Sequence, residues 1–146
     1  MTIRVEIVSQ DRLVFKGDAD MVTLPGIEGE MGVLPGHTPL LTTMAYGVIS
    51  VKAAEDHAFT VAGGIVEVQP EVITILADAA EDVNEINIDR AQAAKRRAEE
   101  MLKQTPVQDT DEYLTIEAAL RRSNLRIEAA SRFRQTKPSH RTKDHD

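Results

Sequence analysis

Arginines in the second half of the chain have the spacing that best suits ligand chemistry. Arg122 and Arg126 lie four residues apart, so they share one face of a helix. Arg90 and Arg97 lie seven apart and share a face in the same way. If two helices pair antiparallel, these faces can meet and form a cationic pocket that holds a polyphosphate bidentately. The same spacing is also typical of a solvated charged face, with three carboxylates as partners: Glu99, Glu117 and Glu128.

Residues 24–41, LPGIEGEMGVLPGHTPLL, are rich in glycine and proline. A phosphate-binding loop of the Walker type needs a Gly-Lys-Ser/Thr sequence, and this stretch has glutamates instead of a lysine. Glu28 and Glu30 are alternate residues, which point to opposite faces of an extended chain and do not form a catalytic pair. His37 has no acid or nucleophile near it in sequence. A turn-rich connector or a shaped docking surface for another protein therefore remains.

Residue types that build metal or covalent sites are scarce. Cysteine is absent, which excludes disulfides and thiolate chemistry and fits a reducing compartment. The four histidines are scattered along the chain, at His37, His57, His140 and His145. The sequence therefore predicts no catalytic residue, no metal site and no required cofactor.

Charge is distributed unevenly along the chain. Residues 1–87 contain four Lys or Arg against fourteen Asp or Glu, whereas residues 88–146 contain thirteen against ten. This asymmetry indicates two parts that meet different partners. Nucleic acid is disfavoured as a ligand of the acidic part, because Lys and Arg make the phosphate contacts. No run approaches the ~18 apolar residues of a membrane-spanning helix, so we expect a soluble, cytoplasmic protein without direct membrane insertion.

The first part has the period of β-strands. Ile3, Val5 and Ile7 alternate with polar residues, which is typical of a half-buried strand. Further apolar runs predict two hairpins, one from residues 48–51 and 59–61 and another from residues 65–68 and 72–76. Short strands separated by turns predict an antiparallel β-sandwich or barrel over residues 1–85.

Two adjacent glycines, Gly63 and Gly64, interrupt one of these runs, FTVAGGIVEV. Glycine weakens a strand, so it usually marks a bulge or a close approach by another backbone. The sequence leaves both interpretations open.

Helical spacing begins at Asn87, which is a predicted N-cap. Two apolar seams follow, the first at Ile88, Ala91, Ala94, Ala98, Met101 and Leu102, and the second at Tyr113, Ile116, Leu120, Ser123, Ile127 and Ala130. Because residues 104–110 break the pattern, we expect an antiparallel two-helix hairpin over residues 86–134. An alanine-rich seam buries little area, so this hairpin needs a surface to lie on. Residues 135–146 are polar and aperiodic and predict a disordered tail.

Four segments together carry a family likeness: GEMGVLPGHTPLL (residues 29–41), VAGGIVEVQP (61–70), VITILADAAE (72–81) and RAQAAKRRAEE (90–100). On these segments the chain resembles the epsilon subunit of bacterial F-type ATP synthases, up to about residue 133. The resemblance implies an α+β fold in which an N-terminal β-sandwich docking domain precedes a regulatory helical hairpin. The fold predicted from periodicity agrees with it.

The resemblance also implies a non-catalytic rotor subunit of the central stalk, at the cytoplasmic face of the cell membrane. Its implied partners are the gamma subunit and the c-ring, with Glu30 facing the c-ring and His37 near gamma. In this family the hairpin lies folded on the sandwich or extends along gamma, where it inhibits ATP hydrolysis. The arginines implied in inhibitory contacts with the catalytic alpha and beta subunits are Arg121, Arg122, Arg126, Arg132 and Arg134.

Some bacterial members bind ATP in the folded hairpin through an Ile/Leu-Asp-x-x-Arg-Ala motif. Residues 86–91 read INIDRA, so Asn87 stands where the motif has aspartate. An amide still offers both an acceptor and a donor. The implied nucleotide-binding positions are Glu81, Asn87, Arg90, Ala91, Arg97, Arg122 and Arg126. The alternative function is accordingly an ATP-sensing protein whose main activity is nucleotide binding.

Overall fold

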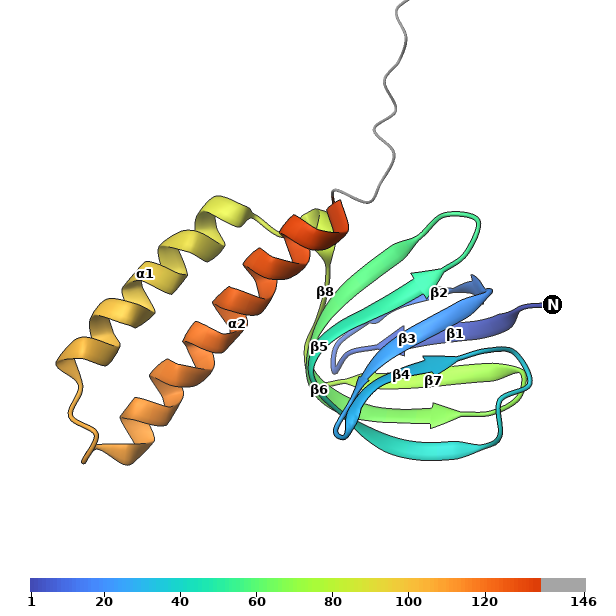
Figure 1. Ribbon diagram of the computed structural model, residues 1–146, viewed down its shortest axis with the longest axis horizontal. Helices are drawn as coiled ribbons and strands as arrows, with labels where there is room; N and C mark the ends of the chain where they lie inside the picture. The colour runs from blue at the N-terminus through green and yellow to red at the C-terminus, as the bar shows by residue number, and fades with distance from the viewer. Residues whose placement is uncertain (135–146) are drawn as a thin grey trace, which may run out of the picture.

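The computed structural model describes residues 1–134 of the chain, as a β domain followed by two helices (Figure 1). The expectation of a disordered tail concerns residues 135–146, which lie outside this range. The strands are β1 (Ile3–Val8), β2 (Leu13–Ala19), β3 (Met21–Gly26), β4 (Gly29–Val33), β5 (Leu40–Lys52), β6 (His57–Val68), β7 (Val72–Ala77) and β8 (Ala80–Asp82). The 3-10 helix η1 (Val83–Glu85) and the helices α1 (Ile88–Gln104) and α2 (Thr110–Arg134) follow.

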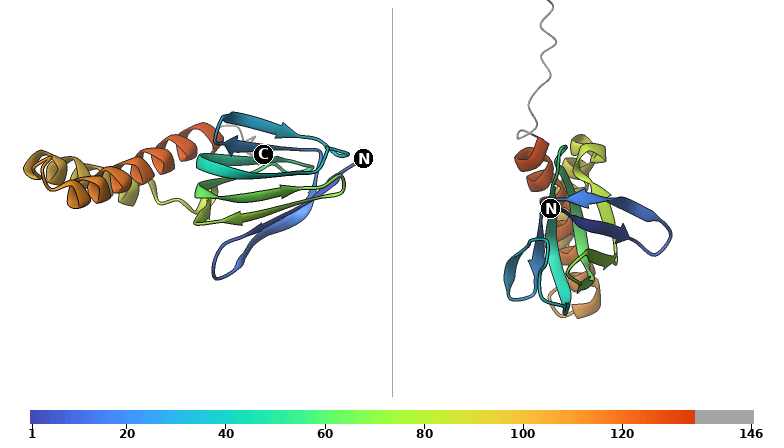
Figure 2. Two further views of the ribbon diagram at one scale, coloured as in Figure 1. Left: turned by 90° about the horizontal axis from the view of Figure 1, so that it is seen from below. Right: turned by 90° about the vertical axis from the view of Figure 1, so that its right-hand side faces the viewer.

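The strands form one sheet in the order β2-β1-β7-β6-β5-β3-β4, with β8 paired to β6. The sheet folds over on itself so that two layers face each other across a core (Figure 2). The predicted sandwich is confirmed, but it is not wholly antiparallel, because β1 pairs parallel with β7. These two strands are far apart in sequence, so no tight turn imposes an antiparallel arrangement on them.

Alternating apolar residues of the strands fill the core between the layers. Ile3, Val5 and Ile7 are fully buried, as their period predicts. Both predicted hairpins are present: Val48 lies opposite Thr60 in the β5–β6 pair, and Val68 lies opposite Ile73 in the β6–β7 pair. The alternation of apolar and polar residues therefore predicts both the individual strands and the way in which neighbouring strands pair.

Gly63 and Gly64 lie where β6 changes its partner from β7 to β8. Their φ angles are +112° and +139°, and a Cβ atom on Gly64 would lie 2.2 Å from the carbonyl oxygen of Leu76. The β5–β6 register runs past them without a shift. A close backbone approach, rather than a bulge, explains the two glycines. This approach brings β8 against the part of β6 that lies near α2.

The helical hairpin forms as predicted, with α1 and α2 side by side and antiparallel (Figure 1). Asn87 is the N-cap of α1, and its side chain accepts a hydrogen bond of 3.0 Å from the backbone N–H of Arg90. Most of the buried side chains in the two helices are small, including Ala91, Ala98 and Ser123. The seam therefore allows close packing of the helices but removes little apolar surface from water.

Candidate functional site

The second half of α2 attaches the hairpin to the sandwich. It lies against β5, β6 and η1, and Figure 1 shows the rest of the hairpin projecting away from the β domain. A small apolar cluster at this junction contains the buried residues Ala58, Val83, Ile86, Ala129 and Ala130. Because four of these five side chains are alanine or valine, the apolar contact at the junction is modest.

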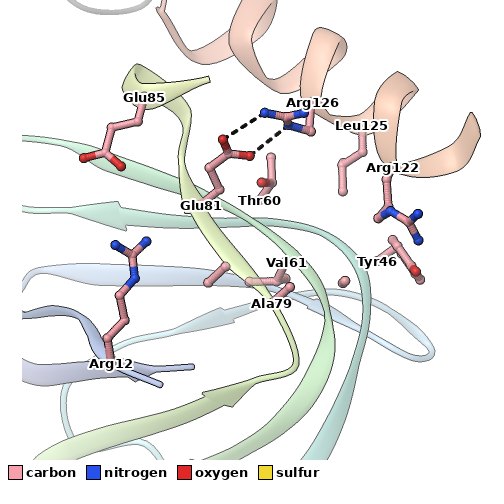
Figure 3. A pocket seen from close by; sticks show the side chains of 12 residues that line it. Arg12, Tyr46, Thr60, Val61, Ala79, Glu81, Glu85, Arg122, Leu125 and Arg126 are labelled. Carbon is pink, nitrogen blue, oxygen red and sulfur yellow. Dashed lines mark hydrogen bonds and ion pairs between the residues drawn. The ribbon is translucent and has the colours of Figure 1, made fainter. Parts of the chain in front are cut away.

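A pocket of about 440 Å³ lies at the junction, between the sheet and α2 (Figure 3). Its size is within the range of sites that bind small molecules. The polar and aromatic residues that line it include Arg12, Tyr46, Glu81, Glu85, Arg122 and Arg126. Apolar atoms of residues such as Val61 and Leu125 complete its wall.

An ion pair between Glu81 and Arg126 joins β8 to α2 across this pocket (Figure 3). The Arg126 guanidinium donates from Nε to one carboxylate oxygen at 2.9 Å and from Nη2 to the other at 3.0 Å. Such bidentate pairs fix orientation as well as charge. Both side chains are about one-third exposed (31% and 33%), so solvent screens the attraction.

Arg134 makes a second set of polar contacts, between α2 and the linker that leads to α1. Its guanidinium donates from Nε to the carbonyl oxygen of Val83 at 2.8 Å and from Nη2 to the carbonyl oxygen of Ile86. The last turn of α2 is thereby fixed to the segment that enters the hairpin. Nearby, the Arg121 guanidinium lies 5.5 Å from the ring centre of Tyr46 in β5, which is cation–π range.

The structure brings together some of the predicted nucleotide-binding residues and not others. Glu81, Arg122 and Arg126 line the same pocket. Arg90 and Arg97 are exposed on α1 and do not line it. Of the two remaining positions, Asn87 caps α1 and Ala91 is fully buried.

Sequence reasoning missed Arg12, Tyr46 and Glu85 as members of this pocket. Arg12 had one usable signal, since it is one of only four basic residues in the acidic first 87 residues. The other two gave no signal in the sequence. Their places depend on how the hairpin lies against the sheet.

The glycine-rich stretch is mostly strand rather than loop. Its first half forms the β3–β4 hairpin, in which Glu30 lies opposite Pro25 at the sheet edge and is exposed. Its second half is held by a backbone hydrogen bond of 2.8 Å from Gly36 N–H to the carbonyl oxygen of Pro70. The His37 ring donates from Nδ1 to the carbonyl oxygen of Thr38 at 2.7 Å. The stretch is therefore a fixed surface.

Glu30 also lines a second groove, of about 470 Å³, between α2 and strands β3–β5. Arg132 of α2 lines the same groove, and its guanidinium lies 5.3 Å from the ring centre of Phe133. One wall of this groove is the β domain and another is the hairpin. Glu30 therefore lies in a groove that both domains form.

An apolar strip crosses the outer face of the sheet. We define it as Leu41, Ile65 and Leu76, which are 71%, 47% and 52% exposed. Ile65 lies directly opposite Leu76, and Leu41 is its diagonal neighbour across the β5–β6 pair. Three large aliphatic side chains therefore lie next to one another on an exposed face of the sheet.

Residues 1–134 contain neither a cluster of metal ligands nor a helix able to span a membrane. No group of three or more His, Cys, Asp or Glu side chains in this range is placed to hold a metal ion. No helix in the same range has the length and apolar character needed to cross a membrane.

The fold and the junction define a class of small two-domain proteins, in which a β-sandwich carries a helical hairpin that is attached to it through arginines of the second helix. Two family descriptions match the chain: "ATP synthase, Delta/Epsilon chain, beta-sandwich domain" over residues 2–83 and "ATP synthase, Delta/Epsilon chain, long alpha-helix domain" over residues 84–131. The chain therefore belongs to the ATP synthase delta/epsilon chain family. Within it, the likeness is to epsilon chains, which are non-catalytic subunits of the complex.

Individual relatives agree with this assignment. The chain is 40% identical to the ATP synthase epsilon chain of Halalkalibacterium halodurans over 132 residues, covering 90% of this chain and 98% of the relative. It is 42% identical to that of Janthinobacterium sp. over 139 residues, covering 92% and 96%. Among solved structures, a chain of the Euglena gracilis mitochondrial ATP synthase, in a structure containing OSCP, F1 and the c-ring, matches with a TM-score of 0.76 and 26% identity. That match covers 89% of this chain and 81% of the Euglena chain. The resemblance drawn from the sequence is confirmed.

Proposed function

We propose that the chain is a rotor subunit of the central stalk that links gamma to the c-ring through its β-sandwich. The apolar strip of Leu41, Ile65 and Leu76 carries this proposal, because it is a ready surface on the rigid part of the molecule. A preformed surface lowers the ordering cost of binding. The similar Euglena chain comes from an assembly that contains F1 and the c-ring, which supports the same role. The protein then works at the cytoplasmic face of the cell membrane as a peripheral component.

Co-purification with gamma tests this docking role. Leu76→Glu places a charge in the strip and is expected to lower the yield of complex at least tenfold, because a buried unpaired charge costs several kcal/mol (about 3 or more). Leu114→Glu is the matched control, since Leu114 has nearly the same exposure (54%) but lies on α2. Equal complex yields from the two variants would contradict the assignment of the strip as the gamma-binding surface.

We also assign docking roles to two residues of the glycine-rich stretch, residues 24–41. Glu30 would face the c-ring, and His37 would face gamma. The β3–β4 hairpin presents the Glu30 carboxylate at a sheet edge, where polar loops of a ring can reach it. The hydrogen bond from Gly36 to Pro70 keeps the neighbouring segment with His37 in place. Glu30→Gln is expected to weaken coupling between proton flow and hydrolysis without unfolding the sandwich.

We propose further that the subunit regulates ATP hydrolysis by moving its hairpin. The folded state uses Arg121, Arg126 and Arg134 to contact the β domain and the linker. Extension would release these guanidinium groups, together with Arg122 and Arg132, to face acidic segments of the catalytic alpha and beta subunits. The same arginines would thus stabilise each state in turn. Within residues 1–134, neither Arg122 nor Arg132 makes an ion pair or a hydrogen bond to the sheet. Reversing the charge of both residues is therefore expected to relieve inhibition in the assembled enzyme.

The junction pocket favours a second candidate function, the binding of ATP in the folded state. Its arginines supply phosphate-binding groups, and its wall includes Tyr46 and Leu125, which can contact a base. A ligand present at ten times its dissociation constant would favour the folded state by about 1.4 kcal/mol. Calorimetric titration of the full chain with MgATP tests this function. Heats indistinguishable from dilution at millimolar nucleotide would contradict it.

A further inference from the structure

Arg12 reaches the junction pocket from the side of the sandwich, opposite α2. It lies in the turn between β1 and β2, where its carbonyl oxygen accepts a backbone hydrogen bond of 3.0 Å from Ser9. Its guanidinium makes no ion pair or side-chain hydrogen bond with any residue in 1–134. Figure 3 shows the side chain pointing toward the pocket, at the end where Glu85 lies.

The charges in the pocket leave two guanidinium groups available to a ligand. Arg126 is held by both oxygens of Glu81. Arg122 is exposed at the opposite end of the pocket from Arg12 (Figure 3). Of the two carboxylates that line the pocket, Glu81 and Glu85, Glu85 lies at the Arg12 end (Figure 3). The pocket therefore has a neutralised centre and a free arginine at each end.

We infer that Arg12 is a phosphate-binding residue contributed by the β domain. The inference rests on the proposed binding of ATP at this pocket, and it adds a residue from outside the helices. A planar guanidinium binds phosphate oxygens in pairs, and nothing in the described structure competes for that of Arg12 except Glu85. Arg90 and Arg97 do not line this pocket, so Arg12 adds a guanidinium on its sandwich side.

The position of Arg12 gives the ligand a regulatory effect. A nucleotide held by Arg12 on the sheet and by Arg122 on α2 bridges the two domains. These contacts exist together only in the folded state, because extension carries Arg122 away from the sheet. A ligand shifts an equilibrium by its differential affinity for the two states. The contact from Arg12 therefore makes the ligand stabilise the folded hairpin.

Three variants of the full chain test the inference, with MgATP binding measured by calorimetry. Arg12→Gln is expected to weaken binding about tenfold, the effect of losing one charge-assisted contact at an exposed site. Glu85→Gln is expected to strengthen binding about twofold, since it removes a repelling carboxylate. Arg4→Gln is the matched control, because Arg4 is an exposed arginine on β1 that pairs with Glu6 outside the pocket.

The outcomes separate this inference from the proposed function. Weaker binding by Arg12→Gln alone, with an unchanged melting temperature, supports it. Equal affinities of the wild type, Arg12→Gln and Arg4→Gln would overturn the role of Arg12 and leave the ATP site in place. Absence of binding by the wild type would overturn both the ATP site and the role of Arg12.

Discussion

The β-sandwich and the helical hairpin are built from buried side chains of different size. The sandwich buries large aliphatic residues completely, among them Ile3, Ile49 and Ile73. The hairpin and its junction bury mainly alanines, such as Ala91, Ala98 and Ala129. Since apolar stabilisation scales with the area removed from water, we expect the sandwich to be the more stable part, whereas attachment of the hairpin depends more on directional contacts. The proposed function needs both properties: a rigid part that docks and a part that can leave.

The largest expected effect is a loss of stability in the sandwich. Ile73→Ala leaves a cavity in the core and is expected to lower the free energy of unfolding by about 3 kcal/mol. The matched variant Ile116→Ala removes the same atoms from a buried position of α2. It should loosen the hairpin and leave the melting of the sandwich unchanged. Denaturation followed by circular dichroism and by NMR signals of the strands distinguishes the two, and equal loss of strand signals would contradict the division.

The next largest effect is a weaker attachment of the hairpin when the hydrogen bonds of Arg134 at the end of α2 are removed. Arg134→Ala removes the hydrogen bonds to the carbonyl oxygens of Val83 and Ile86. We expect the folded position of the hairpin to lose about 1.5 kcal/mol, the usual contribution of hydrogen bonds from a charged group. Amide hydrogen exchange of α2 measures the change. Arg132→Ala, two residues away, provides the comparison and should have little effect on exchange.

A smaller effect is expected for the ion pair across the junction. Arg126→Ala should weaken attachment of the hairpin by about 1 kcal/mol, because the partly exposed pair is screened by solvent. Faster amide exchange in α2 and an unchanged sandwich are the expected results. Lys95→Ala removes an exposed pair with Glu99 within α1 and should leave the attachment unchanged. Protection in Arg126→Ala equal to that of the wild type would show that the pair does not hold the hairpin.

The smallest expected effect is a change in the pKa of Glu112. This residue lies at the start of α2, at the end of the hairpin far from the sandwich. The Asp109 carboxylate raises the pKa of Glu112, first through a side-chain hydrogen bond and then through like-charge repulsion. The pair therefore opposes folding when both groups are charged, and the opposition disappears as the pH falls through the pKa of Glu112. Asp109→Asn should return this pKa toward its ordinary value in an NMR titration, whereas Asp111→Asn should not.

The features that the sequence predicts correctly are those set by local patterns. The period of Ile3, Val5 and Ile7 follows directly from strand geometry, and the N-cap at Asn87 depends on neighbouring residues alone. Gly64 was recognisable as a special position, but only the fold shows that the backbone of β7 approaches it. Local reasoning therefore recovered the elements and their class.

The features that sequence reasoning missed depend on contacts between distant segments. The parallel β1–β7 pair joins two strands that are far apart in the sequence. The contact of Arg134 with Val83 spans 51 residues. Arg12 shares a pocket with Arg122 only because α2 packs against the sheet at β5 and β6. Spacing within one helix could propose an arginine pocket, but it could not show which arginines line the pocket.

The position of the hairpin in the assembled ATP synthase tests the central claim most directly. Because the chain contains no cysteine, Lys52→Cys on β5 and Glu117→Cys on α2 allow specific spin labelling of one sandwich site and one hairpin site. We expect one short inter-label distance with saturating ATP and a second, longer distance when ATP is removed. A single distance that is the same in both conditions would show that the hairpin does not leave the sandwich, and would contradict regulation by movement of the hairpin.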